Sequence, residues 1–201
     1  RQMCIRDSTI ADISISGDGY EYVDGVNGGQ ALSLTGSTYV NLGKDERLQP
    51  ENLTLSFWIN PNETITGEQI ISWNKQEYNT DGWYLTSEND NTPLALSVGE
   101  GANGGQPYKV SVKGNRAEFF PAGEWTHIVV TYDSETKDVA FYRNGEAQSV
   151  NVDYAVGEGR DGVLGSDPDM EKSIGYNGPV YGYAFLNAAL DHYAVSYTHL
   201  T

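Results

Sequence analysis

Aromatic side chains flank two polar loops of the sequence, and this combination suits the binding of a sugar. The loops are 74–82 and 99–107, and the first also carries amide and carboxylate groups. A sugar ring stacks its CH face on an aromatic ring, while its hydroxyl groups need donors and acceptors nearby. The predicted carbohydrate-binding residues are Trp73, Tyr78, Trp83, Tyr108, Asn74 and Asp81. The alternative is that these rings only cover sheet edges.

A catalytic pair of acids is the second kind of chemistry to consider. Retaining glycosidases need two carboxylates roughly 5–5.5 Å apart, and alternate residues of one strand can supply them. The nearest match is Glu88-Asn89-Asp90, but Pro93 stands where a third carboxylate would be needed. His127 lies in a strand-like run, with no serine or cysteine partner that the sequence identifies. We therefore predict no catalytic residues and no enzymatic activity for this segment.

The charge of the chain limits its partners. Its 201 residues contain 12 Lys and Arg against 28 Asp and Glu, which gives a formal net charge of −16. This charge argues against nucleic-acid binding, because nucleic-acid-binding proteins gain affinity by neutralising phosphates with basic side chains. The charge is compatible with a neutral ligand or a cation. No apolar run approaches the ~20 residues of a membrane span.

The elements that position these residues are predicted to be β-strands. In the run 53–60, Leu53, Leu55, Phe57 and Ile59 alternate with Thr54, Ser56, Trp58 and Asn60, as in a strand with one buried face. The runs 125–132 and 139–142 form a hairpin, and an Asn-Gly pair follows. We predict an all-β, two-sheet antiparallel β-sandwich, with Trp58 and Trp125 in its core and a helical turn at 188–194.

The same hairpin carries a family resemblance. The segments Trp125-Thr-His127, Val129-Val-Thr-Tyr-Asp133 and Phe141-Tyr-Arg-Asn-Gly145 resemble the signature of laminin-G-like domains in the concanavalin A-like lectin/glucanase superfamily. The segments 28–34, 39–43, 53–61 and 173–178 resemble further strands of that family in the same order. The resemblance extends from about residue 25 to residue 190 and implies a jelly-roll sandwich.

The resemblance also implies a function. It predicts a non-catalytic carbohydrate-binding module, monomeric by itself, in a larger secreted or cell-surface bacterial protein with an appended hydrolase. A protein-interaction or adhesion module is the alternative, and a glycoside hydrolase is the third hypothesis.

Calcium is the cofactor that the resemblance implies. Such domains often hold one calcium ion at the rim of the sandwich, between an early loop and a late aspartate. The early loop offers Asp18, Asp24 and Asn27, whose oxygens are ligands that calcium accepts. In this chain the segment that corresponds to the late aspartate of the family is Val180–Tyr183, which contains no aspartate. A second candidate is the acidic loop with Asp167, Asp169 and Glu171, which a solvated loop explains equally well.

Both ends of the chain look foreign to the domain. Residues 1–8 and 195–201 resemble translated sequencing-adapter sequence at the ends of metagenomic reading frames. We therefore assign the domain to residues 9–194 and exclude the tails from the fold. The only cysteine, Cys4, lies in the first tail, so the domain is predicted to need no disulfide.

Overall fold

The computed structural model describes residues 13–44, 52–75, 80–101, 105–157, 159–165, 171–176 and 183–196. Nearly all regular structure in these ranges is β-strand. The strands are β1 (Ser14–Ser16), β2 (Tyr20–Asp24), β3 (Gln30–Leu34), β4 (Tyr39–Gly43), β5 (Leu53–Pro61), β6 (Gln69–Lys75), β7 (Gly82–Ser87), β8 (Leu94–Val98), β9 (Tyr108–Val112), β10 (Thr126–Tyr132), β11 (Val139–Arg143), β12 (Glu146–Ala147), β13 (Val150–Tyr154), β14 (Lys172–Ile174) and β15 (Ala188–Ser196).

Two short helices complete the described elements. They are the 3-10 turn η1 (Val26–Gly28) and α1 (Arg116–Phe119). α1 begins at Asn115, whose side chain accepts the N–H groups of Ala117 and Glu118. No helix in the described ranges is long and apolar enough to span a membrane.

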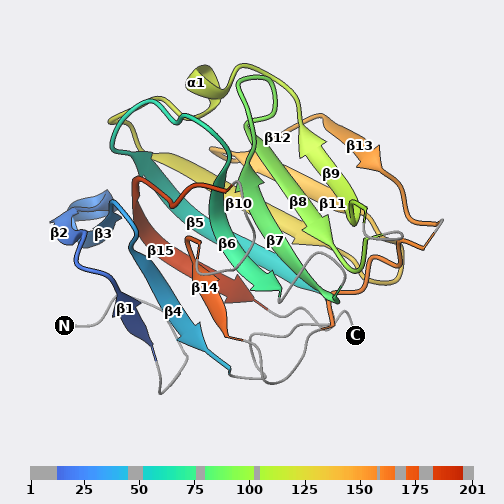
Figure 1. The fold of residues 1–201 in the computed structure, drawn as a ribbon. Helices are drawn as coiled ribbons and strands as arrows, with labels where there is room; N and C mark the ends of the chain where they lie inside the picture. Colours follow the sequence, from blue (N-terminus) through green and yellow to red (C-terminus); the bar gives the residue numbers. More distant parts are fainter. Residues whose placement is uncertain are drawn as a thin grey trace.

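The described strands form two antiparallel sheets that face each other (Figure 1). Sheet A has the order β1-β4-β14-β6-β7-β8-β9-β13, and sheet B has the order β12-β11-β10-β5-β15-β3-β2. The predicted β-sandwich is therefore confirmed.

The core lies between the two sheets because alternate residues of each strand point inward. From sheet B, the predicted inner residues Leu55, Phe57 and Ile59 of β5 are fully buried. From sheet A, Leu85 and Leu96 meet them in the same cluster. The hairpin β10–β11 pairs in register from Ile128–Arg143 to Tyr132–Val139, as its sequence predicts.

The last described strand corrects two expectations. β15 occupies the segment where a helical turn was predicted, because Leu190, Tyr193 and Val195 pack against the core on either side of a bulge between Asp191 and Ala194. Val195 and Ser196 pair with β5. β15 therefore continues two residues past residue 194, where the domain was predicted to end.

The tryptophans are placed in the opposite way to the prediction. Trp58 and Trp125 are only half-buried, whereas Trp73 and Trp83 are 1% and 3% exposed. Trp58 alternates with the core residues of β5, so it must lie on the outer face of sheet B. There its ring packs against that of His127, with centroids 4.8 Å apart.

Candidate functional site

The candidate site lies on the outer face of sheet A, the face on which Trp73 lies. Leu85, Leu96 and Val110 pair across β7, β8 and β9 and belong to the core. The residues between them therefore point away from sheet B. One such row runs from Tyr84 through Ser97 to Lys109, which are paired in register.

Aromatic rings gather at one end of this face. We call Trp73, Tyr84, Tyr176, Tyr183 and Phe185 the aromatic cluster. The centroids of Trp73 and Tyr84 are 5.1 Å apart, and both rings are buried. Tyr183 lies 6.3 Å from Trp73 and 6.1 Å from Tyr84, and Tyr176 lies 5.4 Å from Phe185. The rings of Tyr176, Tyr183 and Phe185 are half-buried, so they form the accessible rim of this aromatic surface.

Charged side chains adjoin the aromatic cluster. The backbone carbonyl of Glu68 accepts the N–H of Ala184, the residue between Tyr183 and Phe185. Burial raises the pKa of the Glu68 carboxyl to about 7, and the negative charge of Glu88 adds to the rise, while Lys109 opposes it. Lys109 Nζ donates to Glu88 Oε1 at 2.6 Å, and both side chains are nearly buried. Two acids and one lysine thus share a partly dry environment.

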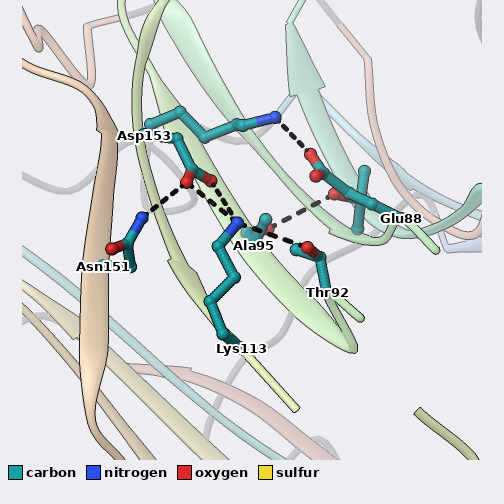
Figure 2. A network of polar contacts seen from close by, with 8 residues as sticks. Glu88, Thr92, Ala95, Lys113, Asn151 and Asp153 are labelled. Carbon is teal, nitrogen blue, oxygen red and sulfur yellow. Dashed lines mark hydrogen bonds and ion pairs between the residues drawn. The ribbon is translucent and has the colours of Figure 1, made fainter. Parts of the chain in front are cut away.

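The same face continues as a polar network toward its edge. Figure 2 shows Lys113 between Thr92 and Asp153. Lys113 Nζ donates to Thr92 Oγ1 at 3.2 Å and lies 2.9 Å from Asp153 Oδ1. Asn151 Nδ2 also donates to Asp153 Oδ1, at 2.8 Å. These bonds join polar groups of β13 to the residues that precede β8 and follow β9.

A tyrosine at the edge of this face carries two cations. Lys109 Nζ lies 5.4 Å from the centroid of the Tyr154 ring, and Arg160 Cζ lies 5.3 Å from it. Such cation–π contacts orient the ring, which is 37% exposed. The outer face of sheet A therefore presents rings at both ends and hydrogen-bonding groups between them.

The six predicted carbohydrate-binding residues do not form one site. Trp73 lies in the aromatic cluster, but Trp83 and Tyr108 face the intersheet core. Tyr108 donates its hydroxyl to the carbonyl of Lys137 at 2.6 Å. Tyr78 lies outside the described residues. A glycan cannot stack on a ring enclosed by the core, so the predicted placement of Trp83 and Tyr108 is wrong.

The other two predicted residues are polar groups near the end of the same strands. Asn74 pairs with Trp83 across β6 and β7, and Asp81 precedes β7. Asn74 is fully buried, and neither its amide nor the Trp83 indole N–H has a hydrogen-bond partner. Asp81 is half-buried. Asn74 therefore lies on the inner side of the sheet with Trp83, away from the outer face where Trp73 lies.

Sequence reasoning missed most of the aromatic cluster. Tyr84 alternates with Trp83 and Leu85 in β7, so the period of the strand placed it on the outer face. Tyr176, Tyr183 and Phe185 have no such signal, because they lie outside regular strands. The position of Tyr183 and Phe185 follows from the pairing of Ala184 with Gln69 of β6, and that of Tyr176 from the pairing of β14 with β6.

The early loop meets an aspartate that was not predicted. Asp18, Asp24 and Asn27 are all exposed. Asp191 Oδ2 accepts the backbone N–H of Val26, within that loop, at 2.8 Å. Asp191 lies late in the chain, but the resemblance predicts the late calcium ligand at Val180–Tyr183. Of that segment the structure describes only Tyr183. Its Leu-Asp-x-Tyr-x-Val setting in β15 is the signal that could have found it.

A calcium ligand set is only partly present at this loop. The described ranges contain no group of three His, Cys, Asp or Glu side chains that could hold a metal ion. A calcium ion near Asp191 would therefore depend on backbone and amide oxygens of the loop, which calcium accepts. Of the second candidate, Asp167 and Asp169 lie outside the described residues, and Glu171 accepts a bond from Asn41 at 2.8 Å.

The catalytic candidates have separate partners. Glu88 is bound to Lys109, whereas Asp90 is bound to Arg116. His127 Nε2 lies 3.1 Å from the hydroxyl of Ser56, a partner that the sequence did not reveal. Burial lowers the pKa of His127. This pair lies on the outer face of sheet B, where Ser56 shares the polar side of β5 with Trp58.

Comparisons with known proteins agree with this architecture. No curated protein is similar to the chain in sequence. Among solved structures, the botulinum neurotoxin serotype D binding domain has a TM-score of 0.58 and 15% sequence identity. That match covers 94% of this chain and 44% of the other.

Two further structures are similar. One concerns botulinum neurotoxin type C and its interaction with two ganglioside molecules, with a TM-score of 0.52, 16% identity, and coverage of 94% of this chain and 39% of that one. The other is the botulinum neurotoxin DC binding domain in complex with rat synaptotagmin II, with a TM-score of 0.51, 13% identity, and coverage of 90% and 38%. The chain thus spans less than half the length of these neighbours, and the likeness shows the fold alone.

A laminin-G family model provides the sequence evidence. It is described as the concanavalin A-like lectin/glucanases superfamily, and it matches residues 34–201. The chain therefore belongs to the concanavalin A-like lectin/glucanases superfamily.

Proposed function

We propose that this domain is a non-catalytic carbohydrate-binding module and that its glycan lies along the outer face of sheet A. The observation that carries the proposal is the aromatic cluster beside Glu68, Glu88 and Lys109. The half-buried rings of Tyr176 and Tyr183 supply apolar contact, and the charged groups supply fixed donors and acceptors. This mixture is what sugar recognition requires.

The absence of catalysis is part of the proposal. Glu68 has a raised pKa, which suits a general acid. Its neighbour Glu88 forms a 2.6 Å ion pair with Lys109, and its side chain is nearly buried, so we assign it to positioning of the polar groups. The site is thus built to hold a ligand by fixed polar groups.

A glycan-array screen of the full chain tests the proposal. The expected result is binding to at least one neutral glycan, weakened by Tyr183→Ala. Tyr142→Ala is the matched control, because Tyr142 is a half-buried ring on the outer face of sheet B. Absence of any glycan signal, or equal loss in both variants, would contradict the proposal.

A protein ligand is the second candidate, and a specific surface favours it. Val150 and Val152 of the edge strand β13 are 46% and 53% exposed, and Tyr154, Val156 and Val163 extend this apolar surface. An edge strand can add a strand from a partner. Val152→Lys would then abolish protein capture and leave glycan binding unchanged. If the variant loses glycan binding and still captures the protein, β13 is not the protein-binding edge.

We also propose that the domain works as one module of a larger secreted or cell-surface bacterial protein. The chain matches less than half the length of each of the three solved structures, and this supports the proposal. The family resemblance predicts a hydrolase as the accompanying domain. The sequence of the parent gene tests both statements directly.

Calcium is a further proposed ligand, at the loop that Asp191 contacts. Asp24, Asn27 and the loop carbonyls would supply the remaining oxygens. A native-state ligand raises the melting temperature by mass action. Calcium should therefore raise it for the wild type but not for Asp191→Asn, whose side chain keeps an oxygen for Val26. No change in the wild type would remove the proposal.

A further inference from the structure

Glu68 is an acid on the outer face of sheet A that has no cation of its own. Among the residues that the structure describes, no basic side chain forms an ion pair with its carboxylate. Lys109 is the cation that lowers the pKa of Glu68, but it donates to Glu88 Oε1 at 2.6 Å. Two carboxylates therefore share one ammonium group here, in a chain whose net charge is −16.

The strand register places Glu68 between an aromatic ring and the second acid. Gln69 forms a parallel bridge with Ala184 on one side and pairs with β7 on the other. Residues next to a bridged pair are themselves neighbours, on the opposite face of the sheet. Glu68 is therefore the neighbour of Tyr183 in one direction and of Glu88 in the other. The Ala184 N–H donates to the Glu68 carbonyl at 2.7 Å and holds the two segments together at this point.

Glu68 and Tyr183 can both be reached from solvent. Each is half-buried, so part of each side chain remains open to a ligand. Glu88 and Lys109 differ from them, because these side chains are only 12% and 13% exposed and are bonded to each other. The unpaired carboxylate and the ring beside it are thus the groups that a ligand on this face contacts.

A carboxylate beside an aromatic ring suits a positively charged group. The face of the ring attracts an ammonium ion, and the carboxylate accepts its N–H groups. Burial and the negative charge of Glu88 raise the pKa of Glu68 to about 7, so its ionised form is disfavoured in the free protein. A cation on the ligand would offset this effect, whereas an anion would increase it.

We propose that the sugar preferred by the outer face of sheet A is a hexosamine with a free amine, whose ammonium group lies against the Glu68 carboxylate while its ring packs on Tyr183. The inference rests on the proposed glycan-binding function and names the sugar class for that same face. A neutral sugar still packs on the rings, but it binds more weakly because it leaves the Glu68 charge without a partner.

Titration calorimetry of the full chain tests this preference. The probes are a β-1,4-linked glucosamine tetramer, its fully N-acetylated form and its N-trimethylated form. At pH 7 the glucosamine tetramer should bind about tenfold more tightly than the acetylated one, because a bond to a charged acceptor is gained.

The trimethylated tetramer isolates the ionisation of Glu68, because its own charge does not depend on pH. Its affinity should rise from pH 6 to pH 8 and then level off, since Glu68 ionises in this range. The other charged groups that act on Glu68 are Glu88 and Lys109, and the segment 183–185 carries no charged side chain.

Glu68→Gln removes the charge and keeps the shape of the side chain. This variant should bind the glucosamine and acetylated tetramers with equal affinity, and it should lose the pH dependence with the trimethylated one. Glu63→Gln is the matched control. It changes an exposed acid on the same connection, and its amide oxygen can still accept the bond from Asn187. The preference for the free amine should persist in this control.

A ring variant separates the charge from the stacking surface. Tyr183→Leu removes the ring and keeps an apolar side chain. It should weaken the binding of the glucosamine and acetylated tetramers by a similar factor, because both use the ring, and the ratio of their affinities should stay near that of the wild type.

The outcomes separate this inference from the proposed function. If the two tetramers bind the wild type equally, or if Glu68→Gln keeps the difference between them, the amine assignment is wrong and the module still binds glycans. If no glycan binds the wild type at all, the proposed function fails and the assignment with it. Propylammonium binding as tightly as the glucosamine tetramer would also overturn the assignment, because charge alone would then be recognised.

Discussion

Lys109 Nζ of β9 lies 2.6 Å from Glu88 Oε1, which follows β7, so the pair crosses the single strand β8 on the outer face of sheet A. The two side chains are 13% and 12% exposed, so water screens the pair only in part. Glu68 is close enough to feel both charges, and its raised pKa of about 7 reflects this environment.

The first prediction concerns the pH dependence of stability. The folded protein binds the Glu68 proton more tightly than the unfolded chain, whose ordinary pKa is 4.5. Glu68 should therefore contribute most to the free energy of unfolding below pH 4.5, and this contribution should be lost as the pH rises through 7. The group is about half exposed, so we expect a loss of only about 1 kcal/mol.

Glu68→Gln provides the control for that prediction. The variant cannot ionise, so its urea midpoint should be higher than that of the wild type at pH 8 and nearly equal at pH 4.5. Glu63→Gln changes an exposed acid on the same connection and should show no such difference. Parallel pH profiles for wild type and Glu68→Gln would contradict the assignment.

The second prediction concerns the ion pair itself. Lys109→Met leaves the nearly buried Glu88 carboxylate without its cation, which should cost about 1–3 kcal/mol. The pKa of Glu68 should rise further, because Lys109 normally lowers it. A carboxyl-carbon NMR titration measures this shift. Lys113→Met, which affects the more exposed pair with Asp153, should leave the Glu68 titration nearly unchanged.

The third prediction contrasts two tryptophans. Trp83→Ala removes an indole that is 3% exposed in the core, so it should destabilise the domain by about 3–5 kcal/mol. Trp58→Ala removes a half-buried ring from the outer face of sheet B and should cost about 1 kcal/mol. Urea unfolding of both variants checks this order, and a reversed order would place Trp58 in the core.

The fourth prediction concerns the contact between Asp191 and the early loop. Asp191→Ala leaves the Val26 N–H without its acceptor, so it should cost about 1–3 kcal/mol in calcium-free buffer. Asp24→Ala removes an exposed carboxylate and should change stability by about 0.5 kcal/mol at most. Equal losses in the two variants would indicate that the Asp191 bond contributes nothing.

Local sequence patterns were sufficient for the fold. The alternation in 53–61 predicts both the strand β5 and its buried face, and the polar turn with Asn144-Gly145 predicts the β10–β11 hairpin. The same alternation also places Trp58 with Thr54 and Ser56, on the outer side. Its assignment to the core was wrong because a residue within a strong strand can lie on either face, and the alternation places Trp58 on the outer one.

The candidate site could not be predicted in the same way. The 184 segment pairs with β6 at Gln69, over 100 residues away, and this contact brings Tyr183 to Trp73. Arg116 likewise meets Gly67 and Asp90 only because three connections converge at one end of the sandwich. No local pattern encodes which loops converge.

The sequence by itself determined the strand-forming segments and the two-layer class, because the periodicity of a strand is a local property. Only the tertiary structure decided which rings are buried and which acidic side chains are removed from water. Those properties depend on the pairing order of the strands and on the depth at which each side chain comes to lie.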